Sequence, residues 1–182
     1  DVAFNPEDSD PERYPSHPGW DQFFGYGRPN AHDLVTRVLA AEIPPEADML
    51  EPRWFDVFNL EERSSLEVVG LPDARRSASF EWEIQAAAGM DPRDTDFTVL
   101  ASGSSSERVE GVLATIDLTG LPVEAAAVIE PYGPQDTNVS KAGKVHVHAA
   151  TLRLQVTDAE GRLGEMRRMI YLQRDPDLLP GM

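Results

Sequence analysis

The sequence contains no cysteine, which excludes disulfide bonds, thiolate zinc sites and cysteine nucleophiles. Positive charge is also scarce, with 16 Lys and Arg against 32 Asp and Glu, a formal net charge of −16. So acidic a surface is unsuited to the phosphates of nucleic acids or of anionic lipids. No apolar run approaches the roughly 18 residues that a membrane-spanning helix needs. What remains is a globular protein, and 41% hydrophobic residues over 182 positions suffice for a core without cross-links.

The first 45 residues differ in composition and hydrophobic pattern from the rest of the chain. Residues 1–19 contain several prolines and no hydrophobic period, which predicts a loop that lies on another part of the protein. An aromatic and glycine-rich cluster follows at 20–30. Asn30 is a candidate N-cap with Asp33 three residues on, and the following apolar residues fall on one helical face. These are Leu34, Val35, Val38 and Leu39, and Pro44 and Pro45 end the predicted helix.

After Pro45, short β-branched and aromatic runs alternate with turn residues, which predicts strands. Phe80, Trp82 and Ile84 alternate with acidic residues, so one face of that strand should be buried and the other wet. The predicted strands cover residues 53–58, 65–70, 77–86, 96–101, 111–117, 144–156 and 165–173.

The last two predicted strands form a hairpin. Leu152, Leu154 and Val156 alternate with Arg153, Gln155 and Thr157 in the same buried-and-wet pattern, and the chain turns back at 158–161. Seven short strands with no long helix between them favour a mainly β, two-sheet antiparallel sandwich over an α/β fold.

Catalytic chemistry finds little support in the residues. No serine lies in a glycine-flanked turn that opens an apolar helix, and the serines at 104–106 are predicted to form a turn after Gly103. The sequence therefore nominates no catalytic, cofactor-binding or metal-binding residues, and the fragment itself is not expected to be an enzyme.

Three places in the sequence carry potential metal ligands. His146 and His148 share one strand face, but zinc takes three or four ligands, so an exposed strand face is the preferred interpretation. Asp158, Glu160 and Glu165 flank one glycine-containing turn, and residues 136–138 crowd another loop. Both loops suit calcium by ligand type, but ordinary turns are the preferred interpretation, so no cofactor is expected and calcium stays an open alternative.

Two further polar segments are given structural interpretations. Asn138 begins a glycosylation sequon by spacing alone. The loop at 91–96 is rich in Asp, and its carboxylates are expected to be solvated.

The segment Gly25-Tyr-Gly-Arg-Pro-Asn-Ala31 resembles the end of the catalytic domain of subtilisin-like serine proteases. In that family a Gly-Tyr-Gly-Arg-Val-Asn-Ala stretch introduces the final helix, and here Pro29 replaces the apolar residue. The family's nucleophile lies in an upstream Gly-Thr-Ser-Met-Ala helix start that has no counterpart in this sequence. The resemblance covers about residues 1–45 and carries over no catalytic residue.

The remainder, over about residues 76–172, resembles β-sandwich modules of large secreted bacterial subtilases and adhesins. The closing hairpin at 151–172 is similar to that of immunoglobulin-like and fibronectin-type modules. The resemblance implies a tail of a subtilase catalytic domain at 1–45, preceded by the rest of that domain, and an accessory β-sandwich at 46–182.

The function that this resemblance implies is a non-catalytic accessory region of an extracellular subtilisin-like endopeptidase, which positions the protease or binds substrate or a partner. The alternative is a stand-alone adhesion or carbohydrate-binding module, which would need a solvent-facing aromatic strip. The expected partners are the upstream catalytic domain and a protein or cell-surface ligand, without nucleic acid or a membrane span.

The aromatic residues at 20–26 and the helix face after Asn30 need cover. Leaving several aromatic side chains wet would cost several kcal/mol at about 25 cal/mol per Å2. We therefore expect residues 20–43 to dock on the sandwich or on a second copy of the chain as a homodimer.

Overall fold

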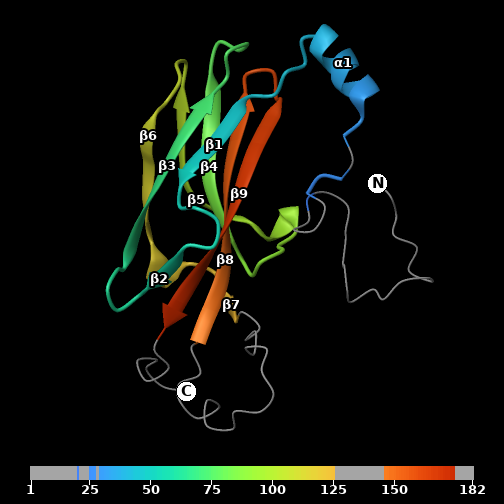
Figure 1. Cartoon of the computed structure of the whole chain (residues 1–182). Helices are drawn as coiled ribbons and strands as arrows, with labels where there is room; N and C mark the ends of the chain where they lie inside the picture. Colours follow the sequence, from blue (N-terminus) through green and yellow to red (C-terminus); the bar gives the residue numbers. More distant parts are fainter. Residues whose placement is uncertain (1–19, 21–24, 28, 126–145, 175–182) are drawn as a thin grey trace, which may run out of the picture.

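The computed structural model describes residues 20, 25–27, 29–125 and 146–174, and all structural statements concern these residues. The fold is mainly β, with two sheets, two single-turn 3-10 helices and one α-helix, and the prediction of a two-sheet architecture is confirmed. Figure 1 shows the sheets as one elongated body, from which the helix projects as a separate arm. No described helix is long and apolar enough to cross a membrane.

The smaller sheet has the strand order β1-β3-β6 and the larger has the order β2-β9-β8-β4-β5, with β7 pairing on β8. The pairs are antiparallel except for β2, which runs parallel to β9. The strands are β1 (Glu46–Glu51), β2 (Val57–Asn59), β3 (Ser65–Asp73), β4 (Phe80–Ala88), β5 (Thr98–Ser105), β6 (Gly111–Asp117), β7 (Glu124–Ala125), β8 (His146–Asp158) and β9 (Leu163–Arg174).

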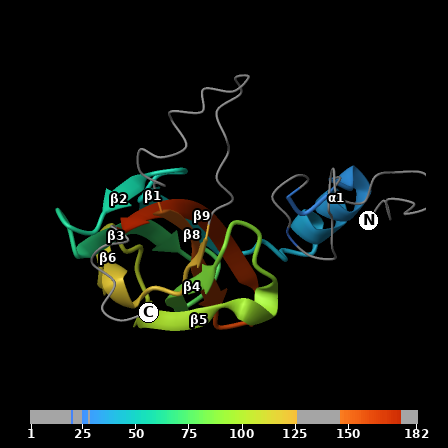
Figure 2. The ribbon, with the colours of Figure 1, turned by 90° about the horizontal axis from the view of Figure 1, so that it is seen from below.

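The core lies between the two sheets, as the view along the strands in Figure 2 makes clear. Met49 and Val68 of the smaller sheet and Ile84, Leu154 and Ile170 of the larger are fully buried. The predicted inward alternation on β4 and β8 is confirmed, since Phe80, Ile84, Leu152, Leu154 and Val156 all belong to this core and Trp82 packs against it. At about 1.5–3 kcal/mol for each fully buried aliphatic side chain, this layer dominates the stability of the fold.

Several predicted boundaries were wrong. The strand expected at 53–58 is a turn up to Asp56, because the Asp56 carboxylate accepts a hydrogen bond from the Arg53 backbone N–H at 2.8 Å, and only β2 follows. Ser104 and Ser105 continue β5 rather than forming a turn, because Gly103 and Ser105 pair with Trp82 and Phe80 of β4, and only Ser106 lies in a bend. Strand β1 was missed since only Met49 of its six residues is buried, which leaves no clear alternation in the sequence.

The helix α1 (Ala31–Leu39) begins at the predicted N-cap. The Asn30 side-chain oxygen accepts hydrogen bonds from the backbone N–H groups of His32 and Asp33, at 3.1 and 3.3 Å. No residue of α1 is buried. The helix is therefore held in place by its flanking segments and not by its own packing.

Candidate docking site for the N-terminal segment

The outer face of the larger sheet carries two buried arginines. Arg153 of β8 and Arg167 of β9 lie directly opposite each other in register, and only 5% and 3% of their surfaces are exposed. Arg153 was expected on a wet face, and that expectation was wrong. Two guanidinium groups facing each other out of water need carboxylates and hydrogen-bond acceptors close by.

Two carboxylates and one amide supply these partners. Glu165 accepts a hydrogen bond from Arg167 Nε at 2.9 Å and lies 3.6 Å from Arg153 Nη1. Asp94 accepts hydrogen bonds from both guanidinium groups, at 3.3 Å from Arg153 Nη1. The Gln85 side-chain oxygen accepts from Arg153 Nε at 2.6 Å. Two positive and two negative charges thus balance in one network, which we call the arginine cluster.

Burial and charge act in opposite directions on Arg153. Loss of solvent lowers the pKa of its guanidinium, while neighbouring Glu165 raises it and Arg167 lowers it further. An arginine stays protonated at physiological pH regardless, so the cluster keeps both of its positive charges.

The loop between β4 and β5 covers part of the arginine cluster. The Phe97 ring lies under both guanidinium groups, 3.9 Å from Arg153 and 5.0 Å from Arg167, measured from the guanidinium carbon to the ring centroid. Arg167 also donates a hydrogen bond to the Pro92 carbonyl at 3.3 Å. The expectation that the acids at 91–96 are merely solvated was therefore wrong at Asp94, which is exposed on one side and paired on the other.

The N-terminal segment provides the rest of the cover. Arg167 lies over the Trp20 ring at 4.9 Å from its centroid, and Tyr26 donates a hydrogen bond from its hydroxyl to Glu165. Gly25 and Gly27 on either side of Tyr26 have φ of 58° and 86°, a conformation that glycine adopts without strain. The predicted docking of this segment on the sandwich is observed at Trp20 and Tyr26.

The Tyr26 hydroxyl is held in its neutral form. Partial burial raises its pKa, and the hydrogen bond to Glu165 together with the negative charge of that carboxylate raises it further. The hydroxyl is therefore protonated at physiological pH and can donate to Glu165.

A second anchor holds the other end of the helix. Arg162, at the β8–β9 turn, donates a hydrogen bond to the Ala41 carbonyl at 2.8 Å. A side chain at Gly164 would place its Cβ 2.1 Å from the Pro45 carbonyl oxygen, so only glycine allows the linker to pass so close. Together with Trp20 and Tyr26, these contacts tie both flanks of α1 to the β8–β9 hairpin. We call this pair of anchors the clamp.

The calcium alternative at the β8–β9 turn finds no support in this geometry. The Asp158 carboxylate accepts hydrogen bonds from Arg162 Nε at 2.6 Å and from two backbone N–H groups, and Glu160 pairs with Arg162 at 2.8 Å. Burial alone would raise the Asp158 pKa, but these hydrogen bonds and the Arg162 charge outweigh it and hold that pKa below its usual range. Within the described ranges, no group of three or more potential ligands could hold a metal ion.

The other sequence candidates do not converge on a site. His146 and His148 both lie in β8, and His148 is half-buried, not exposed as expected. The loop at 136–138, with Asn138, lies outside the described residues. Sequence reasoning did not identify Asp94, Gln85 and Phe97 as partners of the buried arginines. The one available signal was an arginine on each strand of the predicted hairpin, Arg153 and Arg167.

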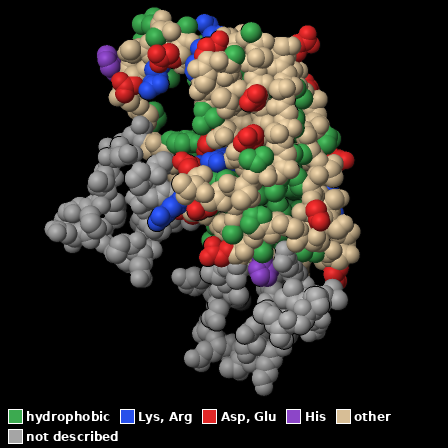
Figure 3. Space-filling model, turned by 180° about the vertical axis from the view of Figure 1, so that it is seen from behind, with side chains coloured by type: hydrophobic (Ala, Val, Ile, Leu, Met, Phe, Trp, Pro, Cys, Tyr) green, Lys and Arg blue, Asp and Glu red, His purple; other side chains and the backbone are tan. Residues whose placement is uncertain are grey.

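The clamp leaves the apolar side of α1 uncovered. Leu34, Val35, Val38 and Leu39 are 62%, 57%, 50% and 82% exposed. Figure 3 shows a gap between the arm and the sheets, and acidic side chains scattered over the visible face. The predicted docking is therefore observed at Trp20 and Tyr26, whereas no residue of α1 is buried.

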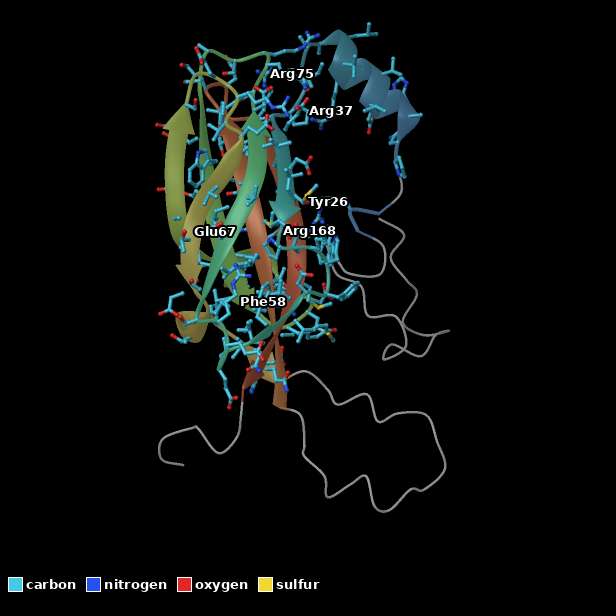
Figure 4. All side chains as sticks on the ribbon, turned by 60° about the vertical axis from the view of Figure 1, so that its left-hand side comes forward. Tyr26, Arg37, Phe58, Glu67, Arg75 and Arg168 are labelled. Atoms are coloured by element: carbon cyan, nitrogen blue, oxygen red, sulfur yellow. The ribbon has the colours of Figure 1, made fainter. Side chains whose placement is uncertain are left out.

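A small hollow lies where the N-terminal segment meets β9. It has a volume of about 200 Å3, and its walls include Trp20, Tyr26, Trp54 and Arg168. Figure 4 shows Tyr26 and Arg168 together on the side of the sandwich that faces the N-terminal segment. The chain matches no known protein-family model, and no curated protein matches it.

Proposed function

We propose that this chain is a non-catalytic accessory region of a subtilisin-like serine endopeptidase. In this proposal, residues 1–45 complete the catalytic domain and residues 46–182 form an accessory sandwich that positions it. The sequence at Gly25–Ala31 supports the family assignment. A secreted bacterial protein and an extracellular location follow from the same resemblance and are part of the proposal.

The observation that carries the proposal is a helix that is tied to the sandwich at both flanks and has its apolar side uncovered. Each of the four exposed aliphatic side chains of α1 would gain up to about 1.5–3 kcal/mol on full burial. The clamp fixes α1 on the sandwich at both flanks, so the sandwich determines where that apolar side points. A catalytic domain that buries α1 would thereby be fixed in orientation relative to the sandwich.

The strand arrangement supports an immunoglobulin-like type of sandwich. With β3, β4, β6, β8 and β9 taken as strands B, C, E, F and G, one sheet reads A-B-E and the other reads G-F-C-C′. The first strand divides between the sheets as β1 and β2, and Trp82 packs against the core from the strand in the C position.

The test combines the coding sequence upstream of Asp1 with an active-site probe. We expect a signal peptide and a Gly-Thr-Ser-Met-Ala stretch upstream. A fluorophosphonate probe should label the longer polypeptide and leave the 182-residue chain unlabelled, because only the former holds the nucleophile. Labelling of the 182-residue chain, or an upstream sequence without the serine motif, would overturn the proposal.

A homodimer through residues 20–43 is the competing explanation for the uncovered helix. Light scattering of the purified chain separates the two, since a catalytic-domain partner predicts a monomer of 20.1 kDa and self-association predicts twice that mass. If the chain is a dimer through α1, Leu34→Glu should lower the measured mass to that of a monomer. If the chain is a monomer, the same variant should leave the measured mass unchanged.

A further inference from the structure

The turn at 53–56 is hydrogen-bonded to β9. The Arg53 backbone N–H is bound by the Asp56 carboxylate at 2.8 Å, and the Phe55 backbone N–H donates to the Met169 carbonyl at 2.9 Å. The Tyr171 backbone N–H donates in turn to the Asp56 carbonyl at 2.8 Å. The turn is thus part of the sheet edge.

This turn displays two aromatic side chains, one of them on a strained backbone. Phe55 has a φ of 66°, in the left-handed region that bulky residues rarely adopt. Yet the Phe55 and Trp54 side chains are 57% and 40% exposed, so burial does not offset the strain. Strain without compensating burial is typical of a functional position.

The two rings belong to a longer series, which we call the aromatic strip. The Trp20 and Trp54 ring centroids are 6.5 Å apart, those of Trp54 and Phe55 are 5.7 Å apart, and those of Phe55 and Tyr171 are 6.4 Å apart. The first and last pairs are close to parallel, with interplanar angles of 19° and 23°. The hollow at the Trp20 end adds the polar side chains of Glu165 and Arg168.

The surroundings of the strip restrict the chemistry of its ligand. A net charge of −16 disfavours polyanions. A cation would compete with arginines already in place, because Arg167 lies over Trp20 at 4.9 Å and Arg168 over Trp54 at 5.6 Å. A neutral ligand with flat apolar faces fits the rings best.

Polar groups beside the rings suit hydroxyls. Arg53 and Glu51 form an exposed ion pair at 3.3 Å next to Trp54. Arg168 donates to the carbonyls of Met49 and Arg167, and it has no carboxylate partner among the residues that the structure describes. Sugar rings combine C–H faces that stack on aromatic rings with hydroxyls that both donate and accept. We propose that the aromatic strip is a binding site for a neutral polysaccharide, a role that does not depend on the peptidase proposal.

The experiment is affinity gel electrophoresis of the full 182-residue chain in gels that contain hydroxyethylcellulose, barley β-glucan, xylan or galactomannan. We expect at least one of these polymers to retard the chain and to quench its tryptophan fluorescence. Trp54→Ala should weaken binding by about tenfold, the scale of one lost aromatic contact with its buried area. The control Val112→Ala, a 54% exposed side chain on β6, should bind as the unmodified chain does.

A second variant separates binding from folding. Phe55→Gly removes the ring and relieves the positive φ, so it should weaken polysaccharide binding without lowering the unfolding temperature. The proposal fails if none of the four polymers retards the chain, or if Trp54→Ala and Phe55→Gly both bind like the unmodified chain. It also fails if a proline decapeptide binds the strip and the polymers do not, because the site would then recognise peptides.

Discussion

The two faces of the β8–β9 hairpin are buried by different means. On the inner face, Leu152, Leu154 and Ile170 are fully buried against the opposite sheet. On the outer face, Arg153 and Arg167 are almost as deeply buried, but under a loop and the N-terminal segment. The inner face needs only apolar side chains at alternate positions, whereas the outer face needs matched charges contributed from distant parts of the sequence. Equal burial therefore does not imply an equal contribution to stability.

The largest expected effect is on the inner face. Leu154→Ala should lower the free energy of unfolding by about 2–5 kcal/mol, because it leaves a cavity in a fully packed layer. The measurement is urea unfolding followed by circular dichroism. Leu163→Ala is the matched control on the same hairpin, since Leu163 is 48% exposed and its loss should cost well under about 1 kcal/mol. Equal losses for the two variants would contradict the position of the core.

A smaller effect is expected on the outer face. Arg167→Met keeps an apolar stem but leaves Asp94 and Glu165 facing Arg153 alone, with one uncompensated negative charge. Breaking a buried ion pair costs about 3–5 kcal/mol, and we expect about 2 kcal/mol here because Asp94 is 60% exposed on its side chain. Unfolding of Arg168→Met provides the comparison, since Arg168 has no carboxylate partner among the described residues.

The outcome for Arg167→Met decides what the arginine cluster does. A loss larger than that of Arg168→Met supports a stabilising network. A variant as stable as the unmodified chain would mean that the cluster contributes specificity of docking without net stability, as hydrophobic replacements of buried ion pairs can do.

The contrast between the faces also explains what the sequence could predict. The inner residues of β4 and β8 and the N-cap at Asn30 follow from patterns within a few residues, and the structure bears them out. The burial of Arg153 does not follow from such a pattern, because its cover comes from Asp94 and Phe97 in the loop between β4 and β5. Local alternation marks Arg153 as outward-facing and cannot say that another segment lies over it.

The predicted strand ends were wrong for a related reason. Residues 104 and 105 have the composition of a turn, yet pairing with β4 extends them into β5. Residues 53–56 have the composition of a strand, yet one hydrogen bond from the Arg53 backbone N–H to the Asp56 carboxylate closes a turn that displays Trp54 and Phe55. Tertiary pairing and a single side chain outweigh composition at these boundaries.

The smallest expected effect lies at the clamp, where the outer face meets the N-terminal segment. Tyr26→Phe removes only the hydroxyl that donates to Glu165, so global stability should fall by no more than about 1 kcal/mol. The main change should be local, with faster amide exchange in the first turns of α1 because one of its two anchors is loosened. Tyr171→Phe is the matched control, since among the described residues the hydrogen-bond partner of the Tyr171 hydroxyl is the Met90 sulfur at 3.8 Å. If both variants leave exchange in α1 unchanged, the Tyr26 hydrogen bond does not hold the helix, and Arg162 with the linker must position it alone.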